Sequence, residues 1–335
     1  MTDKVLLAHG AGGRMTHQLI RELFLPALGN EVLEALEDSA VLDLQGGCLA
    51  FTTDSYVVKP LFFPGGDIGR LALCGTVNDL AMMGARPLGI SASFILEEGF
   101  PLEDLEKVLR SMEQAAEEAG VKVVSGDTKV VERGAAQGLY ITTAGVGLVP
   151  EGIEIRGSGA RPGDLVIVSG PLGDHEVAVL VARGDFSLEG EVRSDCAPLN
   201  GLVEAMVSAS REIHALRDPT RGGLATTLWE IARASGVGVL LKEESIPIRE
   251  EVRGVCDLLG YDPYYLASEG RLLAFVPEGE AEGVLKAMRD HPLGRGAMVV
   301  GRAVEEPPGK VLLRTKIGGH RVLEPLSGEQ FPRIC

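Results

Sequence analysis

The chain has 335 residues, of which 45% are hydrophobic and 24% charged, a composition typical of a soluble globular protein with two domains. A formal net charge of −16 argues against binding nucleic acid, because neutralising phosphates requires basic surfaces. No apolar run approaches the length of a membrane span and no secretion signal is found, so we expect no membrane association and a cytoplasmic location. The five cysteines show no CxxC pair and predict neither a disulfide framework nor a zinc site.

A short strand is predicted at residues 5–8, followed by a glycine loop at residues 9–14 and a helix that Pro26 ends or kinks. Glycines allow backbone N–H groups to approach an anion closely. The loop matches neither GxxxxGKS/T nor GxGxxG, so a tight turn explains it as well as phosphate binding does. Three of its glycines are candidates for contact with a nucleotide: Gly10, Gly12 and Gly13.

A β-hairpin is predicted from residues 41–44 and 48–53, which flank the glycine pair at 46–47. Asp38 and Asp54 lie at the ends remote from that turn and are therefore expected to come close together. Asp54 is expected where its strand leaves the sheet and a loop begins. An ordinary turn residue is the alternative for this position.

Two further aspartates follow in the first half of the chain. Apolar and small residues from Leu71 to Met83 predict a largely buried helix that carries Asp79. A second helix is predicted over residues 102–119, and the next strand, at residues 121–124, delivers Asp127 to a strand end.

The shared feature of these aspartates is their position beside or within apolar elements, where binding residues are often displayed. They are Asp38, Asp54, Asp79 and Asp127. A buried carboxylate is costly unless a cation or hydrogen-bond donors compensate its charge. Oxygen-rich clusters suit Mg²⁺, with water and substrate phosphates completing its shell. The pattern predicts a magnesium–nucleotide pocket without a P-loop, and the alternative is four unrelated loop aspartates.

A domain boundary is predicted at residues 150–152, between a first domain over 1–150 and a second α/β domain over 151–325. The segment at 217–224 launches a helix for which Thr220 is a credible N-cap. Its two arginines and two glycines suit either a phosphate or a tight contact between domains. A strand over residues 139–149 is predicted to close the first domain. In the second domain, predicted strands cover residues 164–169, 237–241, 271–276, 297–304 and 310–316, and predicted helices cover 176–182, 199–206, 250–259 and 281–289.

Two candidates for chemistry lie late in the chain. Glu269 stands between small residues at a strand entry, where either a general base or an exposed turn glutamate fits. Residues 326–335 lack periodicity and end in Cys335. A terminal thiol on such an arm can visit both an internal pocket and another protein, and thiolates accept acyl-type groups. The alternative is a disordered end with an incidental cysteine.

Several motifs resemble the HypE family, the carbamoyl dehydratases of nickel–iron hydrogenase maturation, within the ATP-binding superfamily of aminoimidazole ribonucleotide synthetase. The resemblance spans essentially the whole chain. Its motifs are AHGAGG (8–13), EDSAV (37–41), FTTDSYVVKPLFFPGGDIG (51–69), NDLAMMGARP (78–87), SGDTKVVERG (125–134), DPTRGGLA (218–225) and PRIC (332–335). The acidic motifs are shared with the wider superfamily, whereas the terminal PRIC singles out HypE.

The resemblance implies an α/β (α+β) fold of two domains, with the N-terminal sheet pairing with its mate in a homodimer. It also implies ATP and Mg²⁺ in the cleft. The residues that it assigns to Mg²⁺ and ATP are Asp38, Asp54, Asp79 and Asp127, with further nucleotide contacts from Gly10, Gly12, Gly13 and Thr128. The residues that it assigns to the reaction are Lys129, Glu269 and Cys335.

The implied reaction begins with transfer of a carbamoyl group from the carbamoyltransferase HypF to Cys335. ATP-dependent dehydration, with Glu269 as the candidate base, would convert the thiocarbamate into a thiocyanate. The cyanide would then pass to iron on the HypC–HypD complex. Two other readings stay open: another ATP-dependent synthetase or phosphotransferase of the superfamily, which would tolerate loss of Cys335, and a non-catalytic carrier, which would not turn over ATP. Selenophosphate synthetase fits less well, because no cysteine lies in the N-terminal glycine loop.

Overall fold

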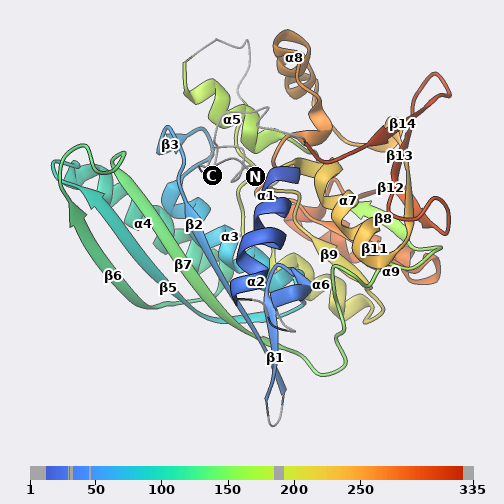
Figure 1. Ribbon diagram of the computed structural model, residues 1–335, viewed down its shortest axis with the longest axis horizontal. Helices are drawn as coiled ribbons and strands as arrows, with labels where there is room; N and C mark the ends of the chain where they lie inside the picture. Colours follow the sequence, from blue (N-terminus) through green and yellow to red (C-terminus); the bar gives the residue numbers. More distant parts are fainter. Residues whose placement is uncertain (1–12, 29, 31–32, 45–46, 185–191, 327–335) are drawn as a thin grey trace.

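A five-stranded sheet curves along one side of the molecule and forms the base of the first domain (Figure 1). The computed structural model describes residues 13–28, 30, 33–44, 47–184 and 192–326. In spatial order the strands are β1 (Ala40–Leu44), β2 (Gly47–Tyr56), β7 (Leu139–Val149), β5 (Arg86–Glu97) and β6 (Val123–Val131). The β5–β6 pair is parallel and the other neighbours are antiparallel. The predicted hairpin is therefore confirmed as β1 and β2.

Two helices, α3 (Ile68–Met82) and α4 (Leu102–Ala119), cover the inner face of this sheet. The carboxylate of Asp67 caps α3 by accepting two backbone N–H groups of its first turn. Almost all of α3 is buried, because the sheet lies on one side of it and the second domain on the other. By contrast, α4 buries one stripe and ends at Gly120, whose φ of 67° is left-handed. Both predicted helices are confirmed.

Asp54 and Asp127 lie inside strands, which corrects the expectation that each stands at a strand end. β2 continues past Asp54 to Tyr56 and stays paired with β7. β6 runs on to Val131, although Gly126 and Asp127 do not favour strands, because parallel pairing with β5 provides backbone hydrogen bonds there. Tertiary pairing thus overrides local preference around Asp127.

The N-terminal helical segment continues past its predicted break. α1 (Arg14–Leu19) passes into a π-helical turn (Ile20–Phe24) and then into α2 (Leu25–Leu28). Pro26 lies in the first turn of α2, directly after the wider π turn. Pro26 therefore marks a change of helix type. A 3₁₀ turn at Leu33–Ala35 follows.

The second domain is built on a seven-stranded mixed sheet (Figure 1). Its strands, in spatial order, are β14 (His320–Leu323), β13 (Val311–Arg314), β10 (Gly238–Lys242), β12 (Met298–Val304), β8 (Leu165–Val168), β11 (Leu273–Val276) and β9 (Ala215–Arg217). Its α-helices are α5 (Asp174–Ala182), α6 (Asn200–Ala209), α7 (Gly223–Ser235), α8 (Glu250–Leu259) and α9 (Glu278–Asp290), and 3₁₀ turns lie at Glu243–Ser245, Pro263–Tyr265 and Pro292–Gly294. The predicted alternation is confirmed, and β9 and β14 are additional.

The start of α7 differs from its prediction. Its N-cap is Gly222 and no side chain caps it, so Thr220 does not have that role. Gly222 and Gly223 adopt positive φ angles of 79° and 56°. A Cβ on Gly223 would lie 2.5 Å from the carbonyl oxygen of Leu266. The two glycines therefore permit the close packing that sets the helix start.

The two domains share an apolar core, in which buried residues of α3 pack with residues of α6. A two-stranded ribbon, β3 (Phe62–Phe63) and β4 (Gly66–Asp67), adds a second contact. Phe63 meets His175 edge-on with ring centroids 5.3 Å apart. The N–H of Ser194 donates to the carbonyl oxygen of Pro64 over 2.7 Å. This packing fixes side chains of both domains relative to one another. Across the described helices, none has the length and apolar character needed to cross a membrane.

Candidate active site

Asp38 reaches the boundary between the domains from the segment before β1. Its side chain, which is 12% exposed, forms an ion pair with Arg217, the last residue of β9 in the second domain. Arg217 also donates to the carbonyl oxygen of Leu36 over 3.2 Å. The Oδ2 atom of Asp38 is buried and has no hydrogen-bond partner among the described residues. The pair therefore joins the domains and leaves one carboxylate oxygen unsatisfied.

Asp79 reaches the same place from α3. The hydroxyl of Thr52, on the inner face of β2, lies 2.8 Å from Oδ2 of Asp79 and 3.1 Å from the carbonyl oxygen of Asp38. Thr52 thus links the hairpin, the segment before it and the buried helix. Asp79 is therefore placed by a helix packed in the core, and the backbone of Asp38 lies next to it through Thr52.

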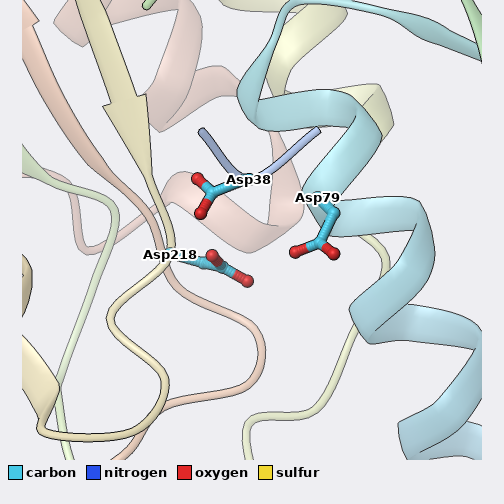
Figure 2. Close-up of side chains that lie close together, drawn as sticks. All are labelled: Asp38, Asp79 and Asp218. Carbon is cyan, nitrogen blue, oxygen red and sulfur yellow. The ribbon is translucent and has the colours of Figure 1, made fainter. Parts of the chain in front are cut away.

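Asp218 is the third acid of the site, and the sequence did not predict it as a ligand. One oxygen from each of Asp38, Asp79 and Asp218 lies within 4.8 Å of the others. Figure 2 shows the three carboxyl groups turned toward a common space. A signal was present, because Asp218 opens the DPTRGG motif, but the three-residue strand β9 before it is too short to be recognised by periodicity.

The surroundings raise the pKa values of all three acids. Burial raises the pKa of Asp38 from 3.8 to about 8, against the lowering effect of Arg217. Burial also raises the pKa of Asp218 to about 6. Burial, followed by the charges of Asp218 and Asp38, raises the pKa of Asp79 well above its usual value. All three carboxyl groups therefore resist ionisation. A cation bound between them would balance the negative charge of their ionised forms.

The cluster fits a divalent cation such as Mg²⁺. Its donors are carboxylate oxygens, which Mg²⁺ prefers, and one oxygen of Asp38 lacks a hydrogen-bond partner within the described part of the chain. Arg217 forms its ion pair with one acid of the three. The donor set therefore suits a cation whose remaining ligands are water and phosphate oxygens.

Asp54 borders this cluster without belonging to it. It lies on β2 two residues beyond Thr52, and its Oδ1 accepts the N–H of Ser55 over 2.7 Å. After burial and other acids, its charge adds to the raised pKa values of Asp79 and Glu269. The structure therefore places Asp54 within electrostatic reach of the site.

Asp127, Thr128 and Lys129 are not brought to the cluster within one chain. Asp127 is 58% exposed at its side chain and pairs with Nζ of Lys129 over 2.7 Å. The strand register places Asp54 level with Gly126, three strands away across the sheet. Three strand spacings amount to about 14 Å. Asp127 therefore cannot share one coordination shell with Asp54 of the same chain.

Glu269 is buried beside the acids, which excludes the exposed-turn alternative for this residue. It is 3% exposed, and its N–H donates to Oδ1 of Asp195 over 3.1 Å. Burial, followed by the charges of Asp218 and Asp195, raises the pKa of Glu269 well above its usual value. A buried carboxyl group with a raised pKa beside a candidate cation site is a candidate proton acceptor.

Gly13 is the one glycine of the predicted loop that lies within the described residues. A Cβ at Gly13 would lie 2.4 Å from the carbonyl oxygen of Leu326, and the N–H of Arg14 donates to that same oxygen over 3.0 Å. The absence of a side chain at Gly13 therefore permits the start of α1 to pack against the backbone of Leu326. Outside the described residues lie three predicted site residues: Gly10, Gly12 and Cys335.

Both domains match known protein families. Residues 36–149 match the AIR synthase related protein N-terminal domain, and residues 161–314 match the AIR synthase related protein C-terminal domain. The fold and its interdomain acid cluster therefore define a two-domain protein of the AIR synthase related class.

Full-length relatives narrow this class. The carbamoyl dehydratase HypE of Azotobacter vinelandii is 54% identical over 331 residues, which cover 99% of this chain and 97% of the relative. A HypE–HypF complex structure has a TM-score of 0.88 at 46% identity, covering 92% of this chain and 99% of that chain. A HypE structure in complex with ATP has a TM-score of 0.83 at 48% identity, covering 99% and 100%. The chain belongs to the carbamoyl dehydratase HypE family.

Proposed function

We propose that this chain is an ATP-dependent carbamoyl dehydratase, which converts a carbamoyl group on Cys335 into a thiocyanate and so supplies the cyanide ligands of nickel–iron hydrogenase. The observation that supports this most directly is the three-carboxylate cluster at the domain boundary with Glu269 beside it. Family membership supports the reaction class, because the A. vinelandii relative is a carbamoyl dehydratase. A similar HypE structure contains ATP.

The acid cluster is the proposed phosphate end of the nucleotide site. Asp38, Asp79 and Asp218 would hold Mg²⁺, with Asp54 at its border, and the cation would neutralise charge on the phosphates during phosphoryl transfer. Arg217 keeps Asp38 in place from the second domain. Since the ligands come from both domains, nucleotide binding would depend on their mutual packing.

The reaction replaces a C=O group by a C≡N group. The carbonyl oxygen of S–C(=O)NH₂ on Cys335 attacks the γ-phosphorus of ATP, and the bond from that phosphorus to the bridging oxygen breaks, releasing ADP. The phosphorylated oxygen then leaves as phosphate, both N–H protons are lost, and S–C≡N remains. Glu269 is the proposed acceptor of an N–H proton. Lys129 is proposed to take part in the same reaction.

The proposed assembly is a cytoplasmic homodimer with two kinds of partner. A HypF-type carbamoyltransferase would load Cys335, which the similarity to a HypE–HypF complex supports. A HypC–HypD complex would accept the cyanide on its iron. Dimer pairing through the outer face of the first sheet is supported by its apolar side chains, among them Phe51, which is 44% exposed.

Two variants test the proposed reaction. Cys335→Ala is expected to abolish carbamoylation, because it removes the acceptor sulfur, and Asp79→Asn is expected to retain the thiocarbamate but stop its dehydration. Intact-mass measurement after incubation with the carbamoyl donor and ATP distinguishes these states. The control is Cys48→Ala, at a partly buried cysteine of β2, which should be carbamoylated and then dehydrated like the wild type. Carbamoylation of the first variant, or normal cyanation of the second, contradicts the proposal.

A further inference from the structure

Asn78 precedes Asp79 on α3, and its fully buried side chain bridges to the second domain. Its Nδ2 donates to the carbonyl oxygens of Ala197 and Glu269, each over 3.2 Å. Its Oδ1 accepts the N–H of Leu199 over 2.7 Å. One amide of the first domain therefore binds two separate backbone segments of the second.

The backbone of Glu269 is held on its other side by Asp195. The N–H of Glu269 donates to Oδ1 of Asp195, whose side chain is 1% exposed. Gly270 packs so closely that a Cβ there would lie 1.8 Å from the carbonyl oxygen of Asp195. The segment from Asp195 to Leu199 thus supports Glu269 directly, and Asn78 is hydrogen-bonded to both.

We propose that Asn78 is a positioning residue, which sets the place of Glu269 relative to the cation site at Asp79; this rests on the proposed function. Asn78 and Asp79 are consecutive residues of a buried helix. The same rigid helix therefore carries the proposed cation ligand, Asp79, and holds the backbone of the proposed base, Glu269, through the side chain of Asn78. Misplacing a catalytic group by about 1 Å can lower a rate by about 10²-fold. Asn78 acts through Glu269 and touches no reacting atom.

Asn78→Asp tests this role with almost no change in size, since a carboxylate cannot donate to the two carbonyl oxygens. The matched control is Asn200→Asp. Asn200, on α6, also donates its amide across the domain boundary, to the carbonyl oxygen of Ala119 over 2.8 Å, but within the described residues it is not hydrogen-bonded to Glu269. Carbamoylated wild-type and variant proteins are mixed with Mg-ATP, and the single-turnover rate of thiocyanate formation and the Kd for ATP are measured separately.

We expect Asn78→Asp to lower that rate by about 10²-fold while ATP affinity stays within about 3-fold of wild type. Asn200→Asp should leave both close to wild type. Should Asn78→Asp fail to fold in a thermal melt, Asn78→Ser replaces it, because its hydroxyl is too short to bridge the three backbone groups.

Three outcomes would overturn the inference. The first is a folded Asn78→Asp variant with an unchanged rate, and the second is an equal loss of rate in Asn200→Asp, which would make general domain packing the cause. The third is a loss of ATP affinity that parallels the loss of rate, which would place the effect at Asp79. Failure of the proposed function is distinguishable, because wild-type protein would then form no thiocyanate.

Discussion

Among the three acids of the cluster, Asp38 forms an ion pair with Arg217. Asp79 and Asp218 lie beside it, so that each carboxyl group is close to the negative charge of the others. The folded state therefore favours the protonated carboxyl groups. A carboxyl whose pKa is raised by folding contributes stability that is present below its unfolded pKa and is lost as pH rises through its folded pKa. Folding raises the pKa of Asp218 from 3.8 to about 6 and that of Asp38 from 3.8 to about 8. The metal-free protein should therefore lose stability as the pH rises from 3.8 to about 8.

Magnesium should reverse this loss, because the cation binds the ionised carboxylates. We expect the increase in melting temperature caused by MgCl₂ to be larger at about pH 8.5 than at about pH 5.5. Asp218→Asn should reduce the difference between the magnesium-induced increases at the two pH values, whereas Asp104→Asn, at a partly exposed residue in the first turn of α4, should preserve that difference. Thermal unfolding with and without MgCl₂ measures the effect, and an equal increase at both pH values argues against a cation at these acids.

At the scale of elements, alternation along β2 gives the first sheet two different faces. Thr52 points inward to the acids, and Phe51 points outward, level with Val146 of β7. Leu148 and Ile95 extend the outer apolar face, with exposed fractions of 37% and 40%. An apolar sheet face of this kind is characteristic of an interface, and a symmetric dimer can cover it.

Phe51→Glu is therefore expected to shift the protein from dimer to monomer, because a charge on the outer face would be buried without a partner. Sedimentation velocity at several concentrations measures the shift. Leu258→Glu, at a 68% exposed leucine of α8, is the matched control and should leave the assembly unchanged. A Phe51→Glu protein that remains dimeric would rule out pairing through this face.

At the scale of the whole molecule, Asp127 and Lys129 lie on the outer face of the sheet. Asp127 is level with Ser93, which is level with Thr142 and then Ser55, all on the side opposite Thr52. The proposed dimer covers that side. Lys129 thus faces the proposed interface and lies about 14 Å from β2 of its own chain, so we expect that it can contribute to the reaction only across that interface, in the site of the partner subunit.

Mixed dimers test this arrangement. Asp79→Asn and Lys129→Ala proteins should each be inactive alone, but a mixed dimer would contain one site with both residues intact. After subunit exchange, dehydration activity should rise to about a quarter of wild type, because half of the dimers are mixed and each has one working site. If exchange is complete by native mass spectrometry and no activity returns, Lys129 acts within its own chain.

Local patterns account for much of the fold. The helix Leu102–Ala119 and the strand Leu139–Val149 have their predicted bounds, because their periodicity and flanking turn residues are local properties. The strand through Asp127 and the helix past Pro26 were predicted less well. Parallel pairing extended the first and a π turn accommodated the second, and neither effect is visible in a short window of sequence.

The sequence by itself determined the two-domain α/β class, the buried helix that carries Asp79, and the hairpin that places Asp38 at its open end. Only the tertiary structure decided that Asp218 completes the cluster, that Asp127 lies on the opposite face of the sheet, and that Asn78 binds the backbone of Glu269. The reason is physical. Periodicity and turn chemistry act between near neighbours in the chain, whereas these three relationships depend on which strands become adjacent and on how two domains pack.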